Sequence, residues 1–145
     1  MLSLLYVSHI RAPSSDRFST LVDIQSASIA RNSRLDITGL LVAAPCHFAQ
    51  LLEGPPENVD SVMTDILADR RHENIRIIRR KMIDYRRCGS WRMVRFESSS
   101  FAATHIEPVL SDTYETEDVE AVRRVEQLFD RLLANQPLTG DIAVR

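Results

Sequence analysis

A short, largely apolar stretch about a third of the way along the chain has a pattern that predicts a β-strand. It reads Phe48-Ala49-Gln50-Leu51-Leu52-Glu53-Gly54-Pro55. Successive residues of a strand point to opposite faces, so Phe48, Gln50 and Leu52 share one face. Gln50 therefore lies in the middle of an apolar strand, where each unmet hydrogen-bonding group of its amide costs about 1–3 kcal/mol. The rest of the chain has to supply partners for it.

The same analysis predicts alternating strands and helices on both sides of this stretch. We expect strands at residues 2–8, 40–44, 75–83 and 91–96, and helices over residues 18–32 and 57–69. Pro45 and Cys46 form a tight connection, which makes the Gln50 strand the second arm of an antiparallel hairpin. The order β-α-β-β-α-β-β predicts an α+β, ferredoxin-like sandwich with a five-stranded mixed sheet and two helices on one face.

The first predicted helix carries two adjoining rows of side chains. In the first row, which is largely apolar, the residues that recur at helical spacing are Phe18, Leu21, Val22, Gln25, Ile29 and Asn32. Ile24, Ser28 and Asn32 form a second row at i, i+4 and i+8, and two of these three residues are polar. Asn32 is also a common residue at a helix C-terminus, which is the alternative interpretation of this position.

The composition changes after residue 96, which predicts a domain over residues 1–96 and a C-terminal extension over residues 97–145. The extension contains a predicted amphipathic helix at about residues 117–135. Its apolar positions are Val119, Val122, Val125, Phe129, Leu132 and Leu133. This stripe either covers the second face of the sheet or is presented to a partner.

The overall composition is that of an ordinary globular protein and excludes several classes. The 145 residues are 44% hydrophobic and 26% charged, with a formal net charge of −2, which argues against a dedicated nucleic-acid binder. The longest apolar stretches are far below the ~18 residues that span a bilayer. No signal peptide is recognisable at the start, so we expect a cytoplasmic protein whose two cysteines are reduced.

No sequence motif supports catalysis or metal binding. Dinucleotide-binding, P-loop, CxxC and HExxH motifs do not occur, and the four histidines are scattered. Ser8 and His9 are adjacent on a strand and point to opposite faces, which argues against a hydrolytic pair. We therefore expect neither catalytic residues nor a metal site.

Four uncharged polar residues in apolar settings remain: Tyr6, Ser28, Asn32 and Gln50. Two interpretations are open. These residues satisfy one another in a polar core network, or they line a pocket for a planar heteroaromatic ligand, whose alternating C=O and N–H groups suit amides.

Several of these residues occur together in a known pattern. Tyr6 on the first strand, Asn32 followed by Ile37-Thr38-Gly39, and the stretch over residues 48–55 resemble the BLUF (blue light using flavin) photoreceptor domain. Asp69, Arg71, His72 and Trp91-Arg92-Met93 extend the collinear resemblance over residues 1–96. Asp36 departs from the family, which frequently has Gly before the Ile-Thr-Gly.

The resemblance implies a noncovalently bound flavin between the two helices, FAD with FMN as the alternative. It places Asn32 at the C4 carbonyl and N3 edge, and Gln50 near N5 with Tyr6 hydrogen-bonded to it. It makes Ile24 and Ile66 the aliphatic walls of the ring and Ser28 a polar neighbour. It places Asp69, Arg71 and His72 around the ribityl and phosphate part, and it makes Trp91 and Met93 the pair that responds to the state of Gln50.

The resemblance also implies a mechanism and an output. Blue light drives proton-coupled electron transfer between Tyr6 and the flavin, and its reversal leaves the hydrogen bonds of Gln50 rearranged. The signal then passes through the fifth strand and the C-terminal helices to a separate signalling protein or to a homo-oligomer. Because the chain after Phe96 is short, we expect no enzymatic output and no nucleic-acid or membrane partner.

Two alternatives give the same residues other roles. In one, the protein is a flavin-free, ferredoxin-like regulatory domain that binds another small ligand. In the other, it is an acylphosphatase-like enzyme in which Arg71 or Arg11, together with Asn32, binds phosphate.

Overall fold

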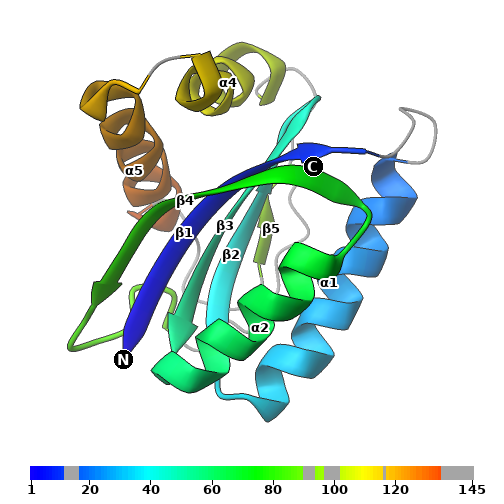
Figure 1. Cartoon of the computed structure of the whole chain (residues 1–145), viewed down its shortest axis with the longest axis vertical. Helices are drawn as coiled ribbons and strands as arrows, with labels where there is room; N and C mark the ends of the chain where they lie inside the picture. The colour runs from blue at the N-terminus through cyan, green and yellow to red at the C-terminus, as the bar shows by residue number, and fades with distance from the viewer. Residues whose placement is uncertain (12–16, 90–93, 97–101, 116, 135–145) are drawn as a thin grey trace.

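The computed structural model describes residues 1–11, 17–89, 94–96, 102–115 and 117–134, which form a three-layer arrangement (Figure 1). A central sheet lies between two pairs of helices. The elements in chain order are β1 Leu2–Ile10, α1 Arg17–Arg34, β2 Thr38–Ala43, β3 His47–Gly54, α2 Pro56–Ala68, β4 His72–Met82, β5 Val94–Phe96, the π-helix η2 Ala102–Ile106, α4 Glu107–Glu115 and α5 Val119–Ala134.

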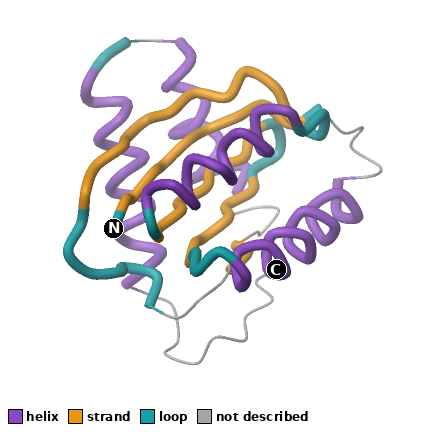
Figure 2. Tube along the Cα trace, turned by 60° about the horizontal axis from the view of Figure 1, so that its bottom comes forward, coloured by secondary structure: helices purple, strands orange, loops and turns teal. Residues whose placement is uncertain are grey.

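The sheet has the strand order β4-β1-β3-β2-β5. β3 is central, and it pairs antiparallel with both β1 and β2, whereas β5 runs parallel to β2. The helices α1 and α2 lie on one face of this sheet, as Figures 1 and 2 show. The predicted α+β, ferredoxin-like fold is thereby confirmed.

The central strands are apolar on both sides because each side faces a core. On β3, Phe48 and Leu52 belong to the core beneath α1 and α2, whereas Ala49 and Leu51 belong to the opposite core. β1 divides in the same way, since Tyr6 joins the first core and Val7 the second. The alternation predicted for the Gln50 strand is therefore the alternation between the two cores.

The C-terminal helix α5 covers the second face of the sheet, which decides between the two roles that its apolar stripe allowed. The side chains of Val125, Phe129 and Leu132 are buried in the core that contains Leu51. The predicted stripe was wrong at its first residue, because Val119 is 72% exposed. Neither this stripe nor the sheet face beneath it is therefore an open partner surface.

Two further helical segments, η2 and α4, precede α5 and were not predicted. The sequence here alternates polar and apolar residues without a long helical period, and α4 contains Pro108 in its first turn, where proline is tolerated. Ile106 and Leu110 enter the same core as α5. Burial of these two side chains, rather than a long apolar stripe, fixes the segment to the sheet.

The fourth strand begins three residues earlier than predicted. His72 was expected to close the preceding helix, but it pairs with Ile10 as the first residue of β4. The predicted fifth strand at residues 91–96 is described only as β5, Val94–Phe96. Trp91 and Met93 lie outside the described residues.

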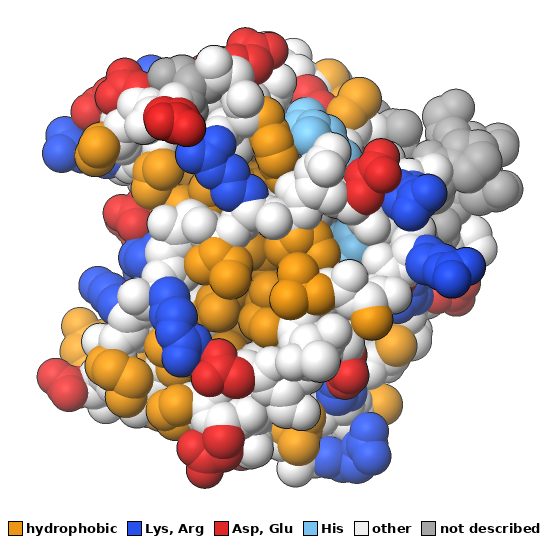
Figure 3. Space-filling model, viewed as in Figure 1, with side chains coloured by type: hydrophobic (Ala, Val, Ile, Leu, Met, Phe, Trp, Pro, Cys, Tyr) orange, Lys and Arg blue, Asp and Glu red, His pale blue; other side chains and the backbone are white. Residues whose placement is uncertain are grey.

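β4 forms one edge of the sheet, and its pairing with β1 is irregular at two places. The exposed Ile77 and Met82 lie on it. On the face of the molecule that Figure 3 shows, hydrophobic side chains gather at the centre. Arg80 on this strand forms an ion pair of 2.7 Å with Asp60 of α2. Bulges and charged side chains are devices that protect an edge strand from pairing with other chains.

Candidate functional site

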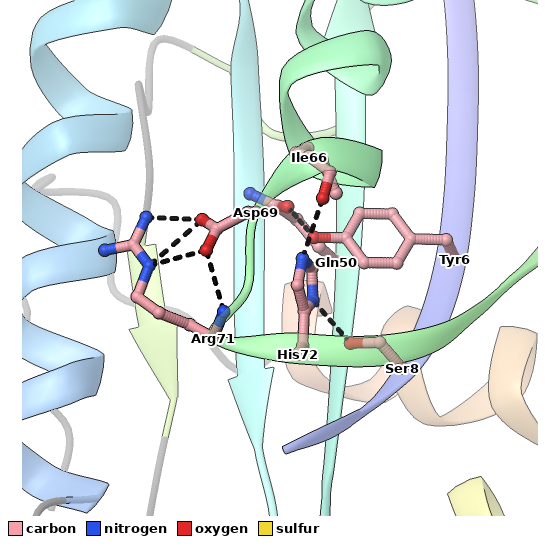
Figure 4. Close-up of polar contacts among 7 residues, drawn as sticks. All are labelled: Tyr6, Ser8, Gln50, Ile66, Asp69, Arg71 and His72. Carbon is pink, nitrogen blue, oxygen red and sulfur yellow. Dashed lines mark hydrogen bonds and ion pairs between the residues drawn. The ribbon is translucent and has the colours of Figure 1, made fainter. Parts of the chain in front are cut away.

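The candidate site is built around a hydrogen bond between the two central strands. Tyr6 of β1 and Gln50 of β3 are directly opposite each other in the strand register. The Tyr6 hydroxyl donates to Oε1 of Gln50, as Figure 4 shows. Both residues are almost fully buried, with 3% and 2% exposure. The neighbouring strand β1 therefore supplies one hydrogen-bond partner for the buried Gln50 amide.

This bond fixes the orientation of the Gln50 side chain. Because Oε1 faces Tyr6, the amide nitrogen lies on the other branch of the planar group and points away from Tyr6 (Figure 4). Burial raises the pKa of Tyr6; the positive charge of Arg31 opposes this effect, and the negative charge of Asp69 adds to it. Tyr6 is therefore a neutral hydrogen-bond donor at physiological pH.

A pocket of about 390 Å³, including its open mouth, lies between α1, α2 and the sheet beside this pair. Its walls combine aliphatic and aromatic side chains with a polar rim. The apolar lining comprises Ile24, Ala27, Leu41, Phe48 and Ile66. The polar lining comprises Tyr6, Ser28, Arg31, Gln50, Asp69, Arg71 and His72.

The orientation of α1 corrects the prediction for its faces. Val22 and Ile29 were expected to face the core, but they are 37% and 41% exposed. The mixed row turns inward instead, because Ile24 is partly buried and Ser28 is 4% exposed. The row that looked unusual in the sequence therefore faces the pocket.

Asn32 continues this inward-facing row and is fully buried. It lies within α1, two residues before the helix ends, and its backbone carbonyl accepts a hydrogen bond of 2.9 Å from Ile37. Asn32 is not among the residues that line the pocket. Its expected role at the flavin edge stays a prediction.

The turn after α1 explains the departure from the family at Asp36. This residue has a φ of +54°, in the left-handed region that glycine adopts most easily. The Arg86 guanidinium contacts both the backbone carbonyl and the carboxylate of Asp36, at 2.8 and 3.0 Å. The contact with Arg86 stabilises the turn, so that Asp36 adopts a conformation that glycine would adopt without such support.

Asp69 and Arg71 form a hydrogen-bonded ion pair at the mouth of the pocket. The Asp69 carboxylate accepts bonds of 2.9 Å from both the backbone nitrogen and Nε of Arg71. Burial acts to raise the pKa of Asp69, but the hydrogen bonds and charge of Arg71 outweigh it and hold that pKa below its usual value. The same hydrogen bonds raise the pKa of Arg71. Both groups are therefore charged.

His72 is held by two hydrogen bonds from different elements. Nε2 lies 3.1 Å from the carbonyl oxygen of Ile66, which only accepts, so Nε2 carries the proton. Nδ1 of the neutral ring then accepts the hydroxyl proton of Ser8 at 2.8 Å. Burial lowers the pKa of His72, which favours this neutral form. The ring stands edge-on to Tyr6 at a centroid distance of 6.1 Å.

Arg31 is a pocket residue that the sequence analysis missed. Its Nε is buried without a hydrogen-bond partner among the described residues, and burial lowers the pKa of its guanidinium. A half-buried cation with an unmet donor suits an anionic ligand. Its position three residues after Ser28 on the same helix was the signal that could have found it.

The residues present fit a flavin. The aliphatic walls suit a planar ring system, and the amide of Gln50 offers both a donor and an acceptor to its edge. Arg31 and Arg71 line the same pocket and suit phosphate groups. Among the described residues, no cluster of three or more His, Cys, Asp or Glu side chains is arranged to bind a metal ion.

The chain matches the family model described as BLUF, sensors of blue-light using FAD, over residues 1–94. The chain belongs to the BLUF family. It is similar to the structure of BlrB, a BLUF protein in the dark state, with 32% sequence identity and a TM-score of 0.76. That match covers 93% of this chain and 96% of the other, so the C-terminal helices of this BLUF protein are part of the similarity.

Two other similar proteins have longer chains. The blue light- and temperature-regulated antirepressor BluF of Escherichia coli (strain K12) is 40% identical over 73 residues, which are 50% of this chain and 18% of that protein. The structure of a bacterial light-regulated adenylyl cyclase is 28% identical with a TM-score of 0.66, over 90% of this chain and 36% of that one. This BLUF chain thus matches less than a fifth of its first curated relative. No helix in the part of the chain that the structure describes is long and apolar enough to cross a membrane.

Proposed function

We propose that this BLUF protein senses blue light with an FAD held noncovalently between α1 and α2. The observation that supports the proposal is the buried Tyr6–Gln50 hydrogen bond beside a pocket with apolar walls and a basic mouth. Ile24 and Ile66 would form the ring walls. Asn32 with Ser28 would hold the polar edge of the ring.

The mouth of the pocket would take the ribityl and phosphate part of the cofactor. Asp69, Arg71 and His72 are the residues expected there, and Arg31 joins them. Asp69 would orient the guanidinium of Arg71, because the two are hydrogen-bonded in a fixed geometry. FMN carries one phosphate fewer than FAD and is the alternative cofactor.

Bound FAD supplies a ring that absorbs blue light and becomes a strong oxidant when excited. Tyr6 would give an electron to that ring, and its hydroxyl proton already points to Oε1 of Gln50. When Tyr6 has recovered its electron and its proton, we propose that the Gln50 amide has rotated or tautomerised. It would then donate a hydrogen bond at a position where it accepted one in the dark. The two arrangements are discrete, because a planar amide offers oxygen on one side and nitrogen on the other.

We propose that the output is a protein contact and not a reaction. The named relatives include an antirepressor and adenylyl cyclases, in which a BLUF-like part accompanies a longer chain. In this chain, residues 1–96 would bind the flavin and residues 97–145 would relay its state through β5, Trp91 and Met93 to a downstream protein or to a second copy. A cytoplasmic location is part of the proposal.

One absorption spectrum tests the proposal against its alternative, a flavin-free regulatory domain. The purified protein supplemented with FAD should be yellow, and blue light should shift its flavin band reversibly to longer wavelength. A protein that stays colourless after supplementation would refute flavin binding. Extraction of the bound flavin and determination of its mass would distinguish FAD from FMN.

A further inference from the structure

The strand that carries Gln50 is tied to the C-terminal helices at its start. Oε1 of Glu107, the first residue of α4, lies 3.1 Å from the backbone nitrogen of Cys46 and 2.7 Å from Nδ1 of His47. Cys46 belongs to the β2–β3 turn, and His47 is the first residue of β3. One carboxylate oxygen of α4 therefore holds the beginning of the Gln50 strand.

A second carboxylate holds the other end of β3. Glu53 is fully buried and accepts hydrogen bonds from the backbone nitrogens of Arg87 and Cys88, at 3.0 and 2.8 Å. The Arg87 guanidinium in turn forms an ion pair with Asp130 of α5. Both ends of β3 thus connect to the C-terminal helices through described residues.

The two attachments differ in how well they are satisfied. Both carboxylate oxygens of Glu53 have hydrogen-bond partners. At the other end, Oε2 of Glu107 and Nε2 of His47 are buried without a hydrogen-bond partner among the described residues. An unmet buried polar atom costs free energy, so the His47–Glu107 contact stabilises its end of β3 less than the fully satisfied Glu53 stabilises the other end. The Glu53 end is the fixed one.

The far end of α4 has attachments of its own, and its Tyr114 ring also lies 5.4 Å from that of His47. The Tyr114 hydroxyl donates a hydrogen bond of 2.6 Å to the backbone carbonyl of Asn74, and Arg76 of β4 donates to the carbonyl of Thr113. The Tyr114 ring also lies against that of His9 at a centroid distance of 4.2 Å. If the contact at Glu107 weakens, α4 keeps its attachment at its C-terminal end and the burial of Ile106 and Leu110, and it loses its hydrogen bonds to the start of β3.

We propose that Glu107 is a positioning residue that transmits the rearrangement of Gln50 from β3 to α4, by a second route beside the one proposed through β5. A change in the Tyr6–Gln50 bond alters the link between β1 and β3, and β3 is held at Glu53. The difference then appears at the His47–Glu107 contact, three residues from Gln50 along the strand. Packed elements respond to such small shifts by changing between discrete arrangements. This inference rests on the proposed function.

Hydrogen–deuterium exchange of the full chain with FAD, in the dark and under blue light, tests the route. In the wild type, we expect illumination to change the exchange of the α4 amides at residues 107–115. Glu107→Ala should keep the light-induced shift of the flavin band, speed dark exchange of α4 roughly tenfold, and lose the light–dark difference there. A purely structural role would speed exchange equally in both states and leave the difference intact.

Two further variants control for charge and for helix stability. Glu107→Gln retains an oxygen that accepts from Cys46 and His47, so it should keep the light–dark difference in α4. Glu115→Ala removes an exposed carboxylate of the same helix and should behave as the wild type. If Glu107→Ala keeps the light–dark difference, or if the wild type shows the flavin shift without any change in α4, the route is refuted. If the wild type shows no flavin shift, the proposed function itself fails.

Discussion

Tyr6 and Gln50 face each other across β1 and β3, and the tyrosine hydroxyl donates its hydrogen bond to the oxygen of the amide. The pair is buried on the face of the sheet that α1 and α2 cover. This relationship gives the amide one defined orientation out of two. The predictions below ask what each part of that arrangement contributes.

Replacement of Gln50, the proposed switch residue, by an apolar side chain of similar size should separate flavin binding from signalling. Gln50→Leu removes both the acceptor for Tyr6 and the donor that would replace it. We expect the protein to bind FAD and to lose the light-induced red shift, measured as a light-minus-dark absorption spectrum. Gln127→Leu, at an exposed glutamine of α5, is the matched control and should keep the shift.

Removal of a single hydroxyl should have the same optical effect for a different reason. Tyr6→Phe keeps the ring in the core but removes the proton donor, so the photochemical rearrangement should not occur. Because Oε1 of Gln50 loses its donor in a buried site, we also expect a loss of about 1–3 kcal/mol in the free energy of unfolding. Tyr85→Phe, at a tyrosine that is 76% exposed, should change neither quantity. A red shift of wild-type size in Tyr6→Phe would contradict the role of Tyr6.

Arg31 should matter for the phosphate end of the cofactor and not for its ring. Arg31→Gln removes a half-buried cation that lines the pocket, and loss of one charge-assisted hydrogen bond should weaken FAD binding about tenfold. Riboflavin, which has the ring without phosphates, should bind nearly as before. Titration by fluorescence quenching measures both affinities, and Arg34→Gln at an exposed arginine of the same helix is the control. Equal losses for FAD and riboflavin would place Arg31 at the ring instead.

His72 should make stability fall at acidic pH. Burial is the main reason that its pKa is below the usual 6.5; the charge of Arg71 acts in the same direction, and the Ile66 carbonyl and Asp69 oppose it. The folded state then binds the proton more weakly than the unfolded state does. The stabilising contribution is therefore complete above about pH 6.5 and is lost as the pH falls below that value.

Denaturant unfolding between about pH 5 and pH 8 measures this dependence. His72→Gln should flatten the fall in unfolding free energy below pH 6.5, because the titrating group is gone. His105→Gln, at an exposed histidine, should keep the wild-type pH dependence. An unchanged profile in His72→Gln would assign the acid sensitivity to another group.

The end of β3 should not tolerate a side chain at Gly54. A Cβ there would lie 2.8 Å from the backbone oxygen of Asp36, which cannot move aside without opening the turn after α1. Gly54→Ala should therefore lower the free energy of unfolding by about 1–3 kcal/mol, measured in urea. At Gly89, with a φ of +60° and open space around it, asparagine adopts the same conformation. Gly89→Asn should change stability much less.

The pattern of apolar positions was sufficient to predict the order of the first six elements and the α+β class. It was also sufficient to place Tyr6 and Gln50 on strands, because alternation with a period of two is a local property of the chain. Errors occurred where tertiary contacts outweigh local pattern. Val22 and Ile29 of α1 are exposed although they are apolar, and η2 and α4 form with little amphipathic signal.

The sequence by itself indicated the residues to which we assign the proposed chemistry: a tyrosine and a glutamine in apolar strands, and a row of polar residues on the first helix. Only the tertiary structure decided how they meet. The register of β1 against β3 places Tyr6 opposite Gln50, and the rotation of α1 turns Ser28 toward the pocket. The contact between Glu107 and His47 joins residues 60 positions apart, and no local pattern encodes it. Such contacts follow from the packing of whole elements, which minimises exposed apolar surface over the entire chain.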